Sequence, residues 1–149
     1  MSKVEKRPER DMKITNYKIE DVEDIGESVG KKFREAGVKD TDSLLANTLK
    51  PTQRKALAEK AGLAEKRILK FANMTDLYRI NGIGSEFSEL LEAAGVDTVP
   101  DLARRNPENL AKKMVKVNEV QKLTRRVPKE SKLANWIEQA KKLPRKLEY

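Results

Sequence analysis

The chain of 149 residues contains no cysteine and no histidine. Histidine is the commonest general base and a frequent metal ligand, and cysteine supplies thiolate nucleophiles and the ligands of most zinc and iron–sulfur sites. We therefore expect no enzyme, and we expect no catalytic residues, no metal and no cofactor.

Aromatic residues and long apolar runs are also scarce. Only 5% of the residues are aromatic, which argues against a surface that stacks the bases of single strands. No apolar run is long enough to span a membrane, and the first residues, MSKVEKRPERDMK, lack the apolar stretch of a secretory signal. The expectation is a cytoplasmic protein that has no membrane partner and no small-molecule substrate.

Positive charge, by contrast, is plentiful and unevenly placed. The net charge is +8, but residues 1–100 hold 18 basic and 18 acidic side chains, whereas residues 101–149 hold 14 basic and 6 acidic ones. A strong field of one sign at one end of a chain suits a polyanionic partner such as nucleic acid, although a solubilising surface would give the same count.

Two segments of the chain repeat each other. DIGESVGKKFREAGVKDTDSLL, which begins at Asp24, aligns without a gap to GIGSEFSELLEAAGVDTVPDLA, which begins at Gly82. We therefore predict a duplicated chain with a charged tail at residues 1–16, a first repeat at residues 17–75 and a second repeat at residues 76–149. Both the first residues and the last few after Pro144 are expected to be loosely ordered.

The helix start and stop signals favour an all-α fold packed into one compact unit. Pro51 and Pro107 suit the first turn of a helix, Asn106 suits an N-cap, and Ser131 suits the N-cap of a last helix that Pro144 ends. Left-handed C-caps are predicted at Gly37, Gly62 and Gly95. The apolar periodicity predicts burial of Ile25, Phe33, Phe71, Ile83, Leu91 and Trp136.

The sequence RINGIGSEF predicts a tight loop between two helices. Gly82 and Gly84 are expected to adopt backbone angles that other residues resist, while Ile83 points into the core. Free backbone N–H groups at the start of the following helix, around Gly84 and Ser85, would then favour an anion.

The stretch INGIGSEFSELL resembles the helix-hairpin-helix motif, and two copies resemble tandem helix-hairpin-helix domains, which bind the DNA backbone without reading its sequence. The longer run GIGSEFSELLEAAGVDTVPDLARRNPENL, with ANWIEQAKKLPR, is similar to a bacterial domain-of-unknown-function family numbered 4332. The resemblance implies that phosphate would meet the loop at Gly82, Gly84 and Ser85. Glu86 and Glu27 depart from the motif, because DNA-contacting hairpins usually place a basic residue there.

The C-terminal third carries an amphipathic basic pattern. In NEVQKLTRRVPKESK, the apolar Val120, Leu123 and Val127 share one face of an expected helix. The candidate phosphate-binding residues of this third are Arg104, Arg105, Lys112, Lys113, Lys116, Lys122, Arg125, Arg126 and Lys129.

Two classes of function remain open from the sequence. One is a non-catalytic protein that binds the backbone of DNA or RNA without sequence specificity, and the other is a helical protein–protein adaptor or a structural subunit of a larger assembly. They differ in whether the basic residues and the Gly82–Gly84 loop meet on one continuous surface.

Overall fold

A computed structural model of the chain describes residues 16–22 and 24–149, so the predicted tail lies outside the described residues except at Asn16. These residues form helices and contain no named strand, which confirms the all-α class. The elements are the short 3-10 helix η2 (Ile19–Asp21) and the α-helices α2 (Gly26–Glu35), α3 (Thr41–Ala46), α4 (Pro51–Ala61), α5 (Glu65–Leu77), α6 (Ser85–Ala93), α7 (Val99–Ala103), α8 (Pro107–Gln121) and α9 (Glu130–Lys142). None of the described helices has the length and apolarity needed to cross a membrane.

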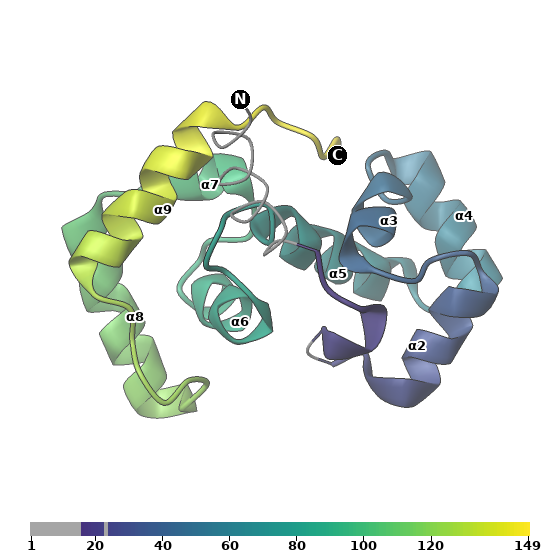
Figure 1. The fold of residues 1–149 in the computed structure, drawn as a ribbon, viewed down its shortest axis with the longest axis horizontal. Coiled ribbons are helices and arrows are strands. Elements are labelled where there is room, and N and C mark those ends of the chain that lie inside the picture. The colour runs from purple at the N-terminus through teal and green to yellow at the C-terminus, as the bar shows by residue number, and fades with distance from the viewer. Residues whose placement is uncertain (1–15, 23) are drawn as a thin grey trace, which may run out of the picture.

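Helix α5 lies at the centre of the molecule. Helices α2, α3 and α4 lie on one side of it, and α6, α7, α8 and α9 lie on the other (Figure 1). Helix α9 packs against both α7 and α8, and α5 packs against α3, α4 and α6. Helices α8 and α9 therefore lie on the side of the molecule that is remote from α4 (Figure 1).

Most of the predicted helix boundaries are confirmed. Pro51 and Pro107 stand in the first turns of α4 and α8, and the Asn106 side chain accepts a hydrogen bond from the backbone N–H of Asn109. Gly37, Gly62 and Gly95 all have positive φ at helix ends. Ser131 was wrongly predicted as a cap, because α9 begins one residue earlier and Lys129 is its N-cap.

The local hydrogen bonding of the two similar segments matches at corresponding positions. The N–H of Val38 bonds to Phe33, and the N–H of Val96 bonds to Leu91, each at 2.8 Å. The bond from Ile25 to Val22 likewise corresponds to the bond from Ile83 to Ile80. These pairs support the duplication, while a full superposition of the halves stays a prediction.

Only one of the two loop glycines has the predicted backbone. Gly82 has φ +104°, and a Cβ atom there would lie 2.8 Å from Nε1 of the Trp136 indole. Gly84 instead has φ −115° and ψ −163°, which is extended backbone, and its Cβ would meet the Tyr17 hydroxyl at an ordinary 3.6 Å. The expectation of a strained angle was therefore correct for Gly82 and wrong for Gly84.

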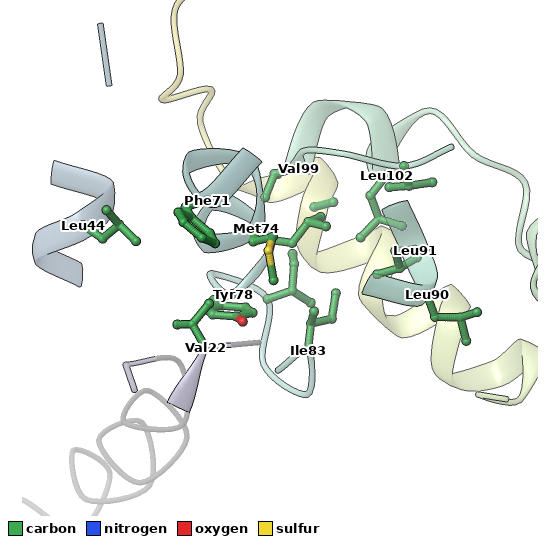
Figure 2. Packing of buried hydrophobic residues seen from close by; sticks show 14 of the residues in the cluster. Val22, Leu44, Phe71, Met74, Tyr78, Ile83, Leu90, Leu91, Val99 and Leu102 are labelled. Carbon is green, nitrogen blue, oxygen red and sulfur yellow. The ribbon is translucent and has the colours of Figure 1, made fainter. Parts of the chain in front are cut away.

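One apolar core joins both sides of α5. Leu44 from α3 and Phe71 and Met74 from α5 lie in the same cluster as Leu91 from α6 and Leu102 from α7 (Figure 2). All six side chains that the periodicity placed in the core are buried, which confirms that prediction. The molecule is held together by this shared core rather than by two separate ones.

The C-terminal residues do not form the loosely ordered end that was predicted. They run from α9 back toward α3 and α4 (Figure 1), where the Leu147 side chain is only 3% exposed among Leu45, Leu49 and Ala72. The Glu148 N–H donates to the carbonyl of Leu49 at 2.8 Å, and the Arg54 guanidinium donates to the carbonyl of Glu148 at 2.6 Å. The segment is fixed because both backbone groups of Glu148 are hydrogen-bonded to residues of the first half.

Candidate nucleic-acid interface

A groove of about 520 Å³ lies between the α5–α6 loop and the N-terminal end of α9. Asn81 and Gly82 line it from the loop, and Phe87 lines it from α6. The opposite side consists of residues 126–129 and the first two turns of α9. The groove therefore joins the predicted glycine loop to the basic C-terminal third.

The floor of the groove is aromatic. The rings of Phe87 and Trp136 pack with their centroids 5.5 Å apart and a tilt of 56°. Trp136 is buried because it shares the apolar face of α9 with Leu133, Ile137 and Ala140. The indole face is thus covered by protein, so Trp136 offers no open ring on which a base would stack.

Gln139 fixes the polar wall of the groove. Its Oε1 accepts the backbone N–H of Asn81 at 2.9 Å, so its Nε2 is the atom that donates to the carbonyl of Asn81 at 3.2 Å. The same Nε2 donates to Oδ1 of Asn135 at 2.9 Å. The side-chain amide of Asn135 consequently presents its NH₂ group as the unused end, which is a hydrogen-bond donor.

The charged lining of the groove is entirely positive. Arg126, Lys129 and Lys132 all border it, and no carboxylate is among the described residues that line it. Each of the three is exposed, and none has an acidic partner within 4 Å in the described part of the chain. Their positive charge is therefore available to an anion from outside.

The basic loop, residues 122–129, is not the helix that the apolar pattern predicted. Helix α8 ends at Gln121, and Lys122 adopts the left-handed φ of +53°. The Asn118 side chain then holds the backbone N–H and carbonyl of Thr124, both at 3.0 Å. Val120 is left 81% exposed rather than buried on an apolar face. The physical reason is that the Asn118 amide offers this backbone partners that compete with further helical turns.

The turn at Lys122 also separates the predicted basic residues. Lys122 and Arg125 lie in the same exposed basic loop as Arg126 but do not line the groove. Lys113 and Lys116 are exposed on α8 and have no acidic partner in the described part of the chain. The groove thus brings together only Arg126 and Lys129 from the predicted basic set.

Three other predicted residues have partners inside the protein. Arg104 pairs with Asp101 at 2.6 Å, and Lys112 pairs with Glu108 at 3.5 Å. The Arg105 guanidinium donates to the carbonyl of Gly95 at 3.0 Å, where it satisfies the end of α6. These three side chains are therefore less available to an external anion than the basic side chains of the groove.

Ser85 and Gly84 contact the first half of the chain instead of the groove. The Ser85 hydroxyl lies 2.8 Å from the Tyr78 hydroxyl and donates to the carbonyl of Asp21 at 3.0 Å. The Tyr17 hydroxyl is the nearest neighbour that a Cβ atom on Gly84 would meet. Of the loop residues that were predicted to meet an anion, only Gly82 lines the groove.

A second pocket, of about 310 Å³, is lined by side chains of both charges. Asp76, Asp97 and Asp101 line it beneath the C-terminal segment, together with Arg104 and Arg145. Burial raises the pKa of Asp97, and the neighbouring Asp101 carboxylate raises it further. The Asp76 carboxylate is already used, since it accepts the backbone N–H of Val99 at 2.8 Å. In the described part of the chain, no group of three or more histidine, cysteine, aspartate or glutamate side chains would hold a metal ion.

Sequence reasoning missed several residues of the groove, above all Lys132 and Asn135. Lys132 stands three positions after Lys129, a spacing that places both on one side of the start of a helix, and this signal was readable. The role of Asn135 could not be predicted from the sequence. It depends on Gln139 of the same helix, whose side chain is held by Asn81 in the distant α5–α6 loop.

A comparison with protein families gives one match. The model of a domain of unknown function, DUF4332, matches residues 23–143. Searches of curated proteins and of solved structures gave no significant match.

Proposed function

The chain belongs to the family described as a domain of unknown function, DUF4332, and for this member we propose a non-catalytic role in binding nucleic acid. It contacts the phosphate backbone without sequence specificity, and the groove between the α5–α6 loop and α9 is the centre of the contact. The observation that carries this proposal is the meeting of Arg126, Lys129 and Lys132 with that loop in a groove that no described carboxylate lines.

Lysine and arginine side chains bind phosphates through charge, and such contacts position a protein on nucleic acid without reading bases. Lys122 and Arg125 in the basic loop, with Lys113 and Lys116 on α8, extend the positive surface beyond the groove. The resemblance of INGIGSEFSELL to the helix-hairpin-helix motif supports the same role. Arg104, Arg105 and Lys112 contribute less, since they already have partners in the fold.

The test is a titration of the full chain against duplex DNA, single-stranded DNA and RNA at several salt concentrations. Each neutralised phosphate of a duplex contributes a slope of about −0.9 to a log–log plot of affinity against salt. A variant with Arg126, Lys129 and Lys132 all changed to Gln should flatten that slope by up to about three units. The helical circular dichroism signal should persist, because the three side chains are exposed.

A matched control has the same net charge. Lys55, Lys60 and Lys66 are exposed on α4 and α5, and changing them to Gln should leave the slope close to that of the parent. Equal losses in both variants would mean that only net charge matters, which contradicts the proposed site. If the parent shows no salt-dependent binding to any of the three nucleic acids, the adaptor hypothesis takes precedence.

A further inference from the structure

We infer that the groove is a site for the terminal phosphate of a nucleic-acid strand, a phosphate monoester, rather than for an internal phosphodiester alone. This inference rests on the proposed function and adds a ligand class to it. Four features of the groove carry it: an unpartnered donor on a buried ring, a polar wall that presents donors, an excess of positive charge, and space beside apolar side chains.

The unpartnered donor is the indole N–H of Trp136. The side chain is 1% exposed, yet this N–H takes part in no hydrogen bond with a described residue. Every fully buried side-chain nitrogen and oxygen in the described part of the chain has a partner. The indole nitrogen is therefore not completely enclosed by protein, and the space that Trp136 lines is the groove. A donor fixed by a buried ring is well placed to bind an anion.

The polar groups next to the indole N–H are hydrogen-bond donors as well. The Gln139 side chain donates a hydrogen bond to the Asn135 side-chain oxygen, so the NH₂ group of Asn135 is left to bind a ligand. The N-terminus of the thirteen-residue α9 borders the groove at Lys129 and Ser131, and its dipole favours negative charge. No side chain caps this helix end. The first two turns of α9 thus both present hydrogen-bond donors to the groove.

The charge of the groove suits a dianion. An internal phosphodiester carries one negative charge, whereas a phosphate monoester carries about −1.5 to −2 at neutral pH and has three acceptor oxygens. Arg126, Lys129 and Lys132 supply three positive charges with no described carboxylate in the lining to offset them. A terminal phosphate would use this excess more fully than an internal one.

The shape agrees with a phosphate that remains attached to a sugar. The volume of about 520 Å³ is within the range of small-molecule sites, roughly 300–1,000 Å³. Phe87, Val127 and Pro128 form apolar walls beside the donors. They offer apolar contact area to a terminal nucleoside, while the donors and the positive charges bind its phosphate.

The experiment compares oligonucleotides of one sequence that end in a 5′-phosphate, a 3′-phosphate or hydroxyls only, as duplexes and as single strands. The parent should bind at least one phosphorylated form about tenfold more tightly than the hydroxyl form, because a hydrogen bond to a charged group is worth at least that factor. Trp136 is the only tryptophan, so its fluorescence should change with the phosphorylated ligand and much less with the hydroxyl ligand.

Lys132→Gln should reduce the preference severalfold, and Lys60→Gln, an exposed control on α4, should retain it. Trp136→Phe should reduce it as well; if that variant does not fold, the exposed Lys132 variant decides the question. Equal binding of phosphorylated and hydroxyl ends by the parent would overturn the inference while leaving the proposed function intact. An undiminished preference in Lys132→Gln would overturn it too, and absence of binding to every oligonucleotide would remove both proposals.

Discussion

Gly82 and Gly84 stand two positions apart in the same loop but differ in what a side chain would cost. At Gly82 an alanine must adopt φ +104° and move the Trp136 indole, which the new Cβ would approach at 2.8 Å. At Gly84 the backbone is extended and the nearest neighbour is 3.6 Å away. The two positions therefore form a natural pair of test and control.

Gly82→Ala should lower the free energy of unfolding by roughly 1–3 kcal/mol, the usual cost of a residue held at such backbone angles. Gly84→Ala should change it by less than about 0.5 kcal/mol. Denaturant titrations of both variants check the prediction. Comparable losses at the two positions would show that the loop has a different backbone from the one described.

The pair of Glu20 and Arg34 gives a pH dependence of known sign. The guanidinium donates two hydrogen bonds to the carboxylate, at 2.6 and 2.7 Å, and this lowers the pKa of Glu20 from 4.5 to about 2. A lowered folded-state pKa means that the pair stabilises the protein above about pH 4.5 and loses that effect as the pH falls toward 2.

Glu20→Gln should therefore lower the melting temperature near neutral pH, and the difference from the parent should shrink between pH 4.5 and about 2. The effect should be small, because the pair is exposed to solvent. Thermal scans of both proteins across this range measure it. A difference that stays constant down to pH 2 would mean that the carboxylate does not titrate as described.

At the scale of elements, the short C-terminal segment after α9 stabilises the packing of the first half. Leu147 lies shortly after the end of α9, but it packs with Leu45, Leu49 and Ala72, which are distant from it in the sequence. Leu147→Ala should cost about 2 kcal/mol, near the low end for buried leucines because this cluster is small. Lys146→Ala, at an exposed neighbour, should change the free energy of unfolding by less than about 0.5 kcal/mol. A loss as small as that of the Lys146 variant would contradict the described packing.

Local signals predicted the helices well, because a cap or a glycine acts within one turn. Pro107 and Asn106 start α8, and Gly95 ends α6, each through contacts a few residues away. The same reasoning failed beyond Gln121, where the apolar spacing of Val120 and Leu123 fits a helix but the Asn118 amide forms a loop. The spacing of apolar residues gives no information about hydrogen bonds that compete with the helix.

The groove and the C-terminal segment could not be predicted because their contacts are distant in sequence. Arg54 reaches the carbonyl of Glu148 across 94 positions, and Gln139 reaches the backbone of Asn81 across 58. The sequence did indicate Gly82, Arg126 and Lys129 as candidates. It did not indicate which candidates share a surface, since that depends on how α9 packs against α7 and α8.

At the scale of the whole molecule, charge and core are distributed differently. The excess positive charge belongs to residues 101–149, whose helices α8 and α9 lie on the side of the molecule opposite α4 (Figure 1). The core, in contrast, extends through α5 from Leu44 to Leu102 (Figure 2). The basic surface on α8 and α9 thus depends on a core to which both halves contribute. We therefore expect the two halves to unfold together.

Cooperative unfolding is testable with two probes. Far-UV circular dichroism reports helices in both halves, whereas the fluorescence of Trp136 reports only the side of α9. The two thermal transitions should coincide in the parent. Leu44→Ala, on the far side of α5 from Trp136, should lower both midpoints together by roughly 5–15 °C. Val120→Ala, at a side chain that is 81% exposed, should leave both nearly unchanged. If Leu44→Ala shifts the dichroism while the Trp136 transition stays in place, the two halves are separate folding units and the shared core does not couple them.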